Sequence, residues 1–173
     1  NRTDQHDTDF LKEIGDMGYL GMTLKTHGCA GASYVQYGLV AAELERVDSS
    51  YRSSFSVQSS LCMEAIAQFG SDEQKDKYLP DLRTGQKIGA FGLTEPNHGS
   101  DPSGLLTKAT PDGKGWRLNG SKTWITHSPI ADVIVVWAKD DQNQICGFIV
   151  EREMKGLETP ASHGKLSLRA STT

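Results

Sequence analysis

Residues 84–104 read TGQKIGAFGLTEPNHGSDPSG, and within this stretch the chain changes from helical to strand-like patterning. Residues 88–93 form a β-prone apolar run, and the residues after them are rich in glycine, proline and serine, which favour turns and loops. Before the stretch, apolar residues recur at intervals of three and four, the spacing of amphipathic helices. We therefore predict an α+β protein with a helical part at 1–86 and a β part at 87–173.

The helical part carries signals for four helices. Asp48 begins a run of good N-cap residues for the third helix, and Gly70 is a typical helix stop. Residues 71–74 (SDEQ) have the form of a capping box that opens the fourth helix. The apolar residues at helical spacing are Phe10, Leu11, Ile14, Met17 and Leu20 in the first helix and Tyr34, Tyr37, Val40, Ala41 and Leu44 in the second.

The β part contains short runs of β-branched and aromatic residues between turn signals such as Asn119-Gly120 and Ser128-Pro129. Short strands at this spacing predict a compact, mainly antiparallel β-barrel or sandwich. The predicted strands are residues 88–93, 116–118, 122–125, 133–138 and 145–150.

Composition narrows the classes of function. The chain has 173 residues with 18 Lys plus Arg against 22 Asp plus Glu, a formal net charge of -4, which argues against a nucleic-acid partner because such proteins need a basic face. No apolar run approaches the roughly 18 residues of a membrane span, so we expect no membrane insertion. The three cysteines are widely scattered and match neither a disulfide framework nor a zinc site, so we expect no metal and a reducing compartment.

The loop after residue 93 has the residue types of an anion site. Small residues at Gly92, Gly99 and Ser100 allow backbone N–H groups to approach a ligand closely, and Thr94 adds a hydroxyl. An ordinary connection between strands uses the same residues. The pattern alone leaves both interpretations open.

Trp124 and Thr126 follow in a second segment. An indole and a hydroxyl so close together can flank and hydrogen-bond a flat heteroaromatic ring. The competing interpretation is a tryptophan that belongs to the core of a small β domain.

Residues 47–60 read VDSSYRSSFSVQSS and place Arg52 in the first turn of the predicted third helix. A helix N-terminus offers free N–H groups and partial positive charge, so an arginine and hydroxyls at this end suit a carboxylate. Alternatively, Arg52 is a surface residue paired with Glu45 or Asp48, which contributes little.

Residues 92–101 (GLTEPNHGSD) and 122–126 (KTWIT) together resemble the paired signatures of the acyl-CoA dehydrogenase family. Residues 71–79 (SDEQKDKYL) and 164–171 (GKLSLRAS) agree, so the resemblance covers nearly the whole chain. His98 departs from the pattern, because a small residue is usual there in the family.

The resemblance implies part of an N-terminal helical bundle followed by a β-barrel middle domain, with FAD as cofactor. The family's catalytic glutamate belongs to a C-terminal helical bundle, which the resemblance places beyond Thr173. We therefore assign no catalytic residue within residues 1–173 and expect this chain alone to be inactive. Glu95 has no catalytic role in the family.

The resemblance also assigns the cofactor contacts. It places Phe91, Gly92, Leu93 and Thr94 along the flavin, Gly99 and Ser100 in the phosphate region, and Trp124, Ile125 and Thr126 against the flavin, with Ser100 also meeting the acyl-CoA.

Residues 43–53 and 57–61 resemble the branch of the family that acts on glutaryl-CoA. This implies that Arg52 and Ser53 bind the distal carboxylate of the substrate, with Glu45 in the same polar network. The expected activity is FAD-dependent oxidation and decarboxylation of glutaryl-CoA to crotonyl-CoA and carbon dioxide, in lysine and tryptophan degradation. Electrons would pass to an electron-transfer flavoprotein.

The branch also implies a homotetramer, located in the mitochondrial matrix of a eukaryote or in the cytoplasm of a bacterium. Two alternatives remain open: a short-chain or other acyl-CoA dehydrogenase, and a truncated, non-catalytic paralogue that binds acyl-CoA.

Overall fold

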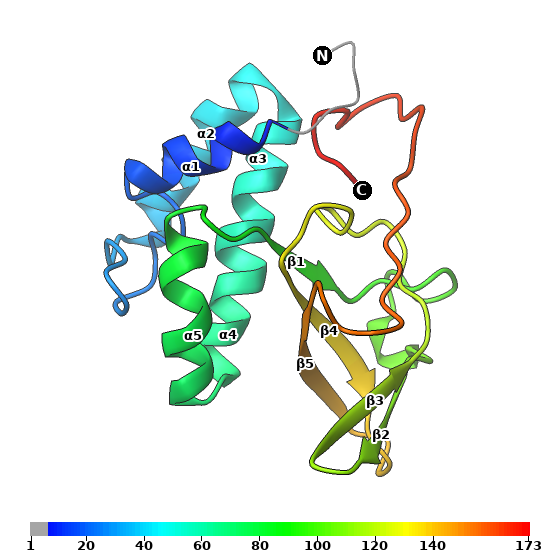
Figure 1. Ribbon diagram of the computed structural model, residues 1–173. Coiled ribbons are helices and arrows are strands. Elements are labelled where there is room, and N and C mark those ends of the chain that lie inside the picture. The colour runs from blue at the N-terminus through cyan, green and yellow to red at the C-terminus, as the bar shows by residue number, and fades with distance from the viewer. Residues whose placement is uncertain (1–6) are drawn as a thin grey trace.

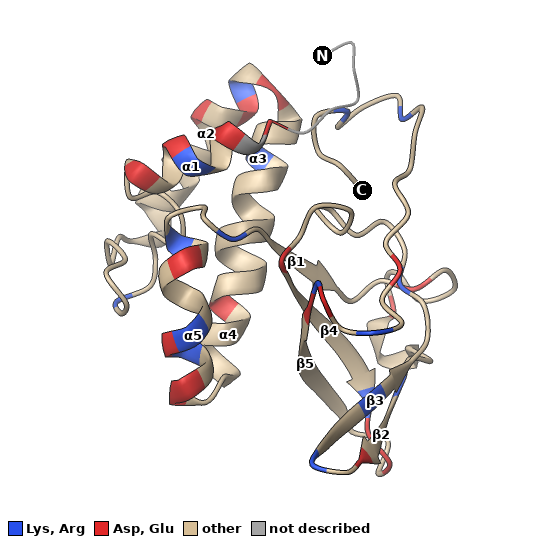
Figure 2. Ribbon diagram, viewed as in Figure 1, with Lys and Arg blue, Asp and Glu red and all other residues tan. Residues whose placement is uncertain are grey.

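The computed structural model describes residues 7–173, in which a group of helices packs beside a five-stranded sheet (Figure 1). The predicted order of a helical part followed by a β part is confirmed. Acidic and basic residues are interspersed along the ribbon in Figure 2, and both kinds occur in the helices. No helix within the described residues is long and apolar enough to cross a membrane.

Six helical segments lie in the described residues of the first part, and all four predicted helices are present. Residues 49–69 form one long helix whose middle turns widen to π geometry, so the third predicted helix comprises three consecutive segments. The bounds are α1 Thr8–Asp16, α2 Tyr34–Val47, α3 Ser49–Ser56, η1 Val57–Met63, α4 Glu64–Phe69 and α5 Asp72–Arg83.

Several helix boundaries lie where the sequence predicts, but α1 ends at Asp16, so Met17 and Leu20, which the helical spacing assigned to the first helix, lie beyond it. The Asp48 side chain accepts a hydrogen bond from the Ser50 backbone N–H at 2.7 Å and caps α3. Ser71 and Gln74 form the predicted capping box at the start of α5. Gly70 ends α4. The extended backbone of Asp48 separates α2 from α3, so the two helices can lie against each other.

The β part is one mixed sheet in which most paired residues are antiparallel, as the sequence predicted. Strand β1 pairs in parallel with β4, while β2 with β3 and β4 with β5 pair antiparallel. Long crossovers are what parallel pairing requires, and residues 93–132 supply one between β1 and β4. The bounds are β1 Gly89–Gly92, β2 Lys108–Asp112, β3 Gly115–Asn119, β4 Val133–Lys139 and β5 Ile145–Glu151, with a 3-10 turn, η2, at Pro102–Gly104.

Two strand predictions were wrong. Residues 122–125 form no strand, because Trp124 adopts a φ of 58°, in the left-handed region that interrupts an extended chain. Strand β2 was missed because it contains Pro111 and Asp112, which in the sequence indicate a turn. The hairpin turn itself follows at Gly113, with a φ of 63°.

The helices cover one face of the sheet. Alternate residues of a strand point to opposite faces, and along β4 Val133 and Val135 join the core of the helical part while Ile134 joins a second cluster on the other face. The helical core also includes Phe55, Cys62, Met63, Leu79 and Leu82, and the second cluster includes Ala90, Ile125, Ala131 and Val150.

Gln58 joins the helical part to the sheet. Its fully buried amide donates to the backbone carbonyls of Leu82 and Lys87, each at 2.9 Å, and accepts from the Gly89 N–H at 2.7 Å. Strand β1 also lies so close to the long helix that position 89 requires glycine, since a Cβ there would lie 2.5 Å from Cys62 Sγ. One side chain thus fixes the end of α5, the connection and the start of β1.

We expect Gln58→Leu to lower the free energy of unfolding by about 2–5 kcal/mol. The substitution keeps the volume but leaves the Gly89 N–H without its acceptor and the Leu82 and Lys87 carbonyls without their donor. The Gly89 amide should also lose protection against hydrogen exchange. Exchange and thermal unfolding of the intact protein measure both effects. Gln86→Leu, at an exposed position, is the control and should change neither; equal effects of the two variants would contradict the bridging role.

Candidate functional site

The loop that follows β1 turns back on itself immediately. Glu95 and His98 exchange two backbone hydrogen bonds, each 3.1 Å long. Phe91 and Gly92 end β1, and Leu93 and Thr94 lead into this turn. Gly99 and Ser100, the predicted phosphate-region residues, lie exposed just beyond the turn, where an added Cβ on Gly99 would meet nothing within 4 Å.

His98, the departure from the family pattern, is accommodated by Gly104. A Cβ on Gly104 would lie 2.4 Å from His98 Nδ1, so the imidazole occupies the space that a side chain at 104 would need. The larger residue at 98 is therefore compatible with the turn. Gly99 and Ser100 remain exposed beside it.

The second predicted segment lies beside the first. The Thr123 N–H donates to the Thr94 carbonyl at 2.9 Å, which brings residues 122–126 against the end of β1. Trp124 is 70% exposed, so it is not the core residue that the competing interpretation required. Its neighbour Ile125 is buried in the second cluster, and Thr126 follows. An exposed indole and a nearby hydroxyl are thus presented next to the loop.

A buried ion pair connects these two segments. Lys122 Nζ donates to Glu95 Oε1 at 2.8 Å and to the Leu93 carbonyl at 3.1 Å, and the two charged side chains are only 11% and 4% exposed. The Glu95 carboxylate also accepts from the Leu106 N–H at 2.6 Å and the Thr107 N–H at 2.9 Å, and from the Thr107 hydroxyl. It is held from three sides.

These contacts determine the charge of Glu95. Burial alone would raise its pKa, but hydrogen bonds from Lys122, Thr107 and the Leu106 backbone outweigh burial and lower the pKa of Glu95 to about 2. A carboxylate this acidic is a poor proton acceptor near neutral pH, so the structure supports the exclusion of Glu95 as a catalytic base.

Arg52 lies in α3 and pairs with Glu45, as one of the two interpretations predicted. Its Nε donates to Glu45 Oε2 at 2.7 Å, and the side chains are 37% and 45% exposed. Hydrogen bonds from Ser49 and Arg52 hold the pKa of Glu45 below its usual value. A guanidinium has five N–H donors, so the bond through Nε still allows Arg52 to bind a second carboxylate.

Ser53 and Arg52 do not share a face of α3, because successive helical residues are rotated by about 100°. Ser56, four residues after Arg52, does share its face. The Tyr37 hydroxyl donates to Ser56 Oγ at 3.1 Å. Ser56 was not among the residues predicted from the sequence, although its i, i+4 spacing from Arg52 places both on one face of α3.

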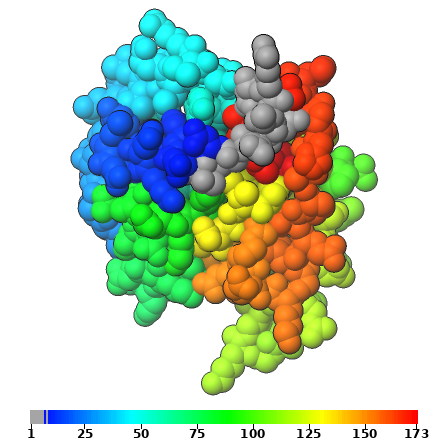
Figure 3. Space-filling model, turned by 45° about the horizontal axis from the view of Figure 1, so that its top comes forward, coloured from blue at the N-terminus to red at the C-terminus, as the bar shows by residue number. Residues whose placement is uncertain are grey.

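The C-terminal segment connects α3 with Thr126. The Ala170 N–H donates to Ser50 Oγ at 3.2 Å, and Ser171 Oγ donates to Thr126 Oγ1 at 3.5 Å. The His127 N–H donates to the Thr172 carbonyl at 2.7 Å. Figure 3 shows this segment, coloured orange to red, along the surface beside the yellow residues near 125. The predicted substrate and cofactor residues therefore belong to one connected region.

Thr173 is tied into the same segment. Its carbonyl accepts from the Ser162 N–H at 2.6 Å, and its hydroxyl accepts from Lys165 Nζ at 2.8 Å. Thr173 is thus held by hydrogen bonds within this region. The expected catalytic glutamate, placed beyond Thr173 by the family resemblance, lies outside the described residues and stays a prediction.

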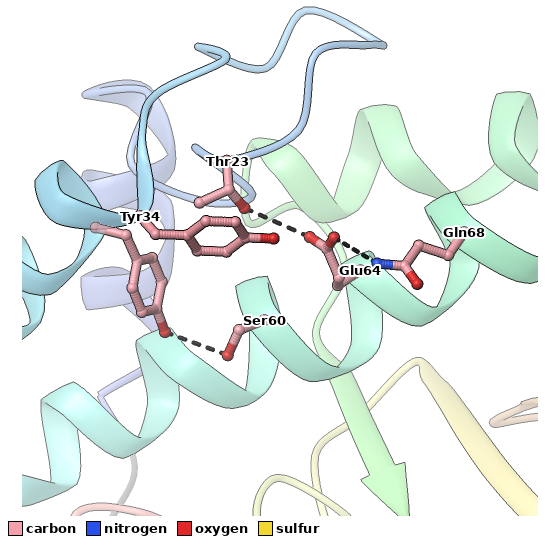
Figure 4. Close-up of a pocket in the computed structure, with 6 residues that line it drawn as sticks. Thr23, Tyr34, Ser60, Glu64 and Gln68 are labelled. Carbon is pink, nitrogen blue, oxygen red and sulfur yellow. Dashed lines mark hydrogen bonds between the residues drawn. The ribbon is translucent and has the colours of Figure 1, made fainter.

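A separate hollow lies on the helical part, between α2 and α4 (Figure 4). Glu64 accepts there from Thr23 at 3.4 Å and from Gln68 at 2.9 Å. The volume of this hollow, about 140 Å³, is below the roughly 300–1,000 Å³ of ligand pockets. It is too small for a dinucleotide or an acyl-CoA, and none of the predicted site residues lines it. The described residues contain no cluster of metal-ligating side chains either.

The lowered pKa of Glu95 predicts loss of stability in acid. Glu95 stabilises the fold fully above its unfolded value of 4.5, and the stabilisation is lost as pH falls from 4.5 to about 2. The shift corresponds to about 3 kcal/mol. Free energies of unfolding of the intact protein, measured across this range, should fall more steeply with acid than those of Glu95→Gln. Glu153→Gln, at an exposed site, should behave as the parent; identical slopes for the parent and Glu95→Gln would contradict the assignment.

Comparison with known proteins identifies the fold. The acyl-CoA dehydrogenase N-terminal domain matches residues 1–86, and the acyl-CoA dehydrogenase middle domain matches residues 90–173. The crystal structure of a glutaryl-CoA dehydrogenase from Mycobacterium smegmatis in complex with FADH2 has a TM-score of 0.95 and 49% sequence identity, and covers 98% of this chain and 44% of that chain.

Curated relatives act on other acyl groups. Mitochondrial isovaleryl-CoA dehydrogenase of Pongo abelii is 39% identical over 172 residues, which are 95% of this chain and 41% of that protein. Short-chain specific acyl-CoA dehydrogenase of Clostridium acetobutylicum is 36% identical over 178 residues, which are 100% of this chain and 47% of that protein. The chain thus spans less than half the length of these relatives. Because two successive family domains match nearly all of it in the observed order, the chain belongs to the acyl-CoA dehydrogenase family.

Proposed function

We propose that this chain provides flavin-binding and substrate-orienting residues of an FAD-dependent acyl-CoA dehydrogenase that oxidises and decarboxylates glutaryl-CoA to crotonyl-CoA and carbon dioxide. The observation that carries the substrate assignment is the position of Arg52. It lies in the first turns of α3, a helix whose Ser50 is connected to Thr126 through residues 170–171. A cation at this position suits an acyl chain with a second carboxylate.

The residues fit a flavin. The 70% exposed indole of Trp124 offers a flat apolar surface, and Thr126 supplies a hydroxyl close to it in the chain. Phe91, Gly92, Leu93 and Thr94 lie next to this segment, and the exposed Gly99 and Ser100 suit phosphate groups. When bound, FAD accepts the electrons of the oxidation. The residues of this chain would hold and orient it: Trp124, Ile125 and Thr126 from the second segment, and the residues of the loop after β1.

Arg52 and Glu45 would orient the substrate together. Glu45 is held ionised by Ser49 and Arg52, and its bond to Nε fixes the direction of the guanidinium. The other N–H groups of Arg52 can then take the distal carboxylate in bidentate geometry. Fixing both ends of the acyl chain places its reacting carbons, which is a substantial contribution to lowering a barrier.

The remaining assignments follow from the same family resemblance. Ser100 contacts the acyl-CoA, the catalytic base lies beyond Thr173, and electrons pass to an electron-transfer flavoprotein. We propose a homotetramer, with a role in lysine and tryptophan degradation. The compartment would be the mitochondrial matrix or the bacterial cytoplasm, according to source.

Two observations favour other functions. The charge of Arg52 is already matched by Glu45, so a monocarboxylic acyl-CoA would leave no cation unpaired, and curated relatives act on isovaleryl and short-chain groups. A non-catalytic acyl-CoA-binding paralogue is the second alternative. Anaerobic reduction of the intact protein's flavin by glutaryl-CoA or butyryl-CoA distinguishes these cases, because a paralogue would show reduction by neither.

Arg52→Ala should lower kcat/KM for glutaryl-CoA by about 100-fold, because the distal carboxylate of the substrate loses its charged partner. The value for butyryl-CoA should change little. Steady-state kinetics of the intact enzyme with both substrates measure the ratio. Arg46→Ala, which removes an exposed arginine paired with Glu43 on α2, is the matched control. An unchanged preference in Arg52→Ala would refute the carboxylate assignment.

Two serines compete for the same carboxylate: Ser53, from the family resemblance, and Ser56, from the geometry of α3. A serine that accepts from Tyr37 can still donate its own proton, and Ser56 lies on the Arg52 face. We therefore expect Ser56→Ala to raise KM for glutaryl-CoA by about 10-fold and Ser53→Ala by less. The reverse order would assign the contact to Ser53.

A further inference from the structure

We propose that Glu95 and Lys122 are a positioning pair for the flavin-contact residues: together they hold Trp124 in the backbone conformation that presents its indole beside the loop after β1. The inference rests on the proposed function, since the indole is positioned for FAD. Neither side chain touches the cofactor in this proposal. Both act through the two segments that they connect.

Three segments meet at the Glu95 carboxylate. Its own turn is closed by the paired Glu95 and His98 backbone bonds. Leu106 and Thr107 donate to it from the chain just before β2. Lys122 donates from the segment that leads to Trp124. From its own turn, the carboxylate therefore bonds both of the other segments, and removing its charge loosens the segments from one another.

Lys122 then fixes the segment relative to β1. Its Nζ bonds the Leu93 carbonyl at 3.1 Å, and its stem lies over Gly92, where an added Cβ would be 3.5 Å from Lys122 Cγ. Thr123 adds the backbone bond to Thr94 at 2.9 Å. Lys122 and Thr123 are thus both held against residues assigned to the flavin.

Trp124 is the residue that needs this support. Its φ of 58° lies in the left-handed region, which is unfavourable for a bulky side chain and persists only where neighbouring contacts determine it. Lys122 and Thr123 are fixed on one side, and Ile125 is buried on the other. The backbone at 124 has to make the turn between them, and the indole stays 70% exposed.

The alternative is an ion pair that stabilises the loop without affecting Trp124. A double-mutant cycle separates the two, because residues that act through one another give non-additive effects. The cycle uses Glu95→Gln, which keeps the shape but removes the charge, and Trp124→Phe. The quantity measured is the Kd for FAD of the intact apoprotein, titrated by the change in flavin fluorescence, so catalytic turnover is not needed.

We expect Trp124→Phe to weaken FAD binding by about 10-fold in the parent and by less than about 2-fold in Glu95→Gln, with Glu95→Gln alone weakening it by about 30-fold. Acrylamide quenching of Trp124 fluorescence in the apoprotein, taken as the difference between the parent and Trp124→Phe, should also change in Glu95→Gln. Equal factors for Trp124→Phe in the two backgrounds, or unchanged FAD affinity in Glu95→Gln, would overturn the proposal.

Matched controls test whether any ion pair or any exposed tryptophan gives the same result. Asp81→Asn removes the exposed partner of Lys87, an ion pair of 2.9 Å outside the site, and Trp116→Phe changes an exposed tryptophan on β3. Neither should alter FAD affinity. If Glu95→Gln does not fold, Lys122→Met replaces it in the cycle, because Glu95 then keeps the Leu106 and Thr107 donors.

The outcomes separate this inference from the proposed function. A parent protein that binds no FAD refutes both. A parent that binds FAD with additive effects refutes the positioning pair alone. Loss of glutaryl-CoA preference on Arg52→Ala is independent of either result, because Arg52 lies on α3 and shares no hydrogen bond with Glu95 or Lys122.

Discussion

The buried amide of Gln58 determines where the site lies. Its hydrogen bonds to Leu82, Lys87 and Gly89 connect the last helix, the linker and the first strand through one side chain. Because Gly89 sits against Cys62, the strand can approach the long helix more closely than any larger residue at 89 would permit. This contact therefore sets the position of the loop after β1. It also sets the distance between the proposed flavin-contact residues and α3.

Serines of residues 47–60 also connect separate parts of the chain through buried hydrogen bonds. Ser59 accepts from the Gly21 N–H at 3.1 Å and Ser50 accepts from the Ala170 N–H at 3.2 Å, and both serines are buried. A hydroxyl is small enough to fit between a helix and a passing backbone while satisfying its polar group. The serines of this segment therefore have structural roles besides any part in a carboxylate site. Ser50 and Ser59 join remote parts of the chain to the helix, and Arg52 provides the positive charge of the proposed carboxylate site.

The sequence was sufficient for the features that depend on local chemistry. Caps such as Asp48 and Ser71 act within a few residues, so the helix boundaries could be predicted. Trp124 could not be predicted in the same way, because its left-handed backbone depends on Lys122 and on bonds to residues about thirty positions away. The parallel pairing of β1 with β4 likewise depends on a crossover that no local pattern encodes. The position of Ser56 on the Arg52 face of α3, in contrast, could have been predicted from helical spacing alone.

Two carboxylates of the region, Glu95 and Glu45, are paired with cations, and this limits what these two groups can do chemically. Glu95 is held by Lys122 and Glu45 by Arg52, and in each case hydrogen bonds lower the pKa of the carboxyl. An efficient general base needs a pKa near the working pH, and a depressed pKa moves in the wrong direction. Since a permanently ionised carboxylate is well suited to orienting a cation, these groups favour binding and alignment. In the proposed oxidation, the proton would therefore pass to a group whose charge is less stabilised.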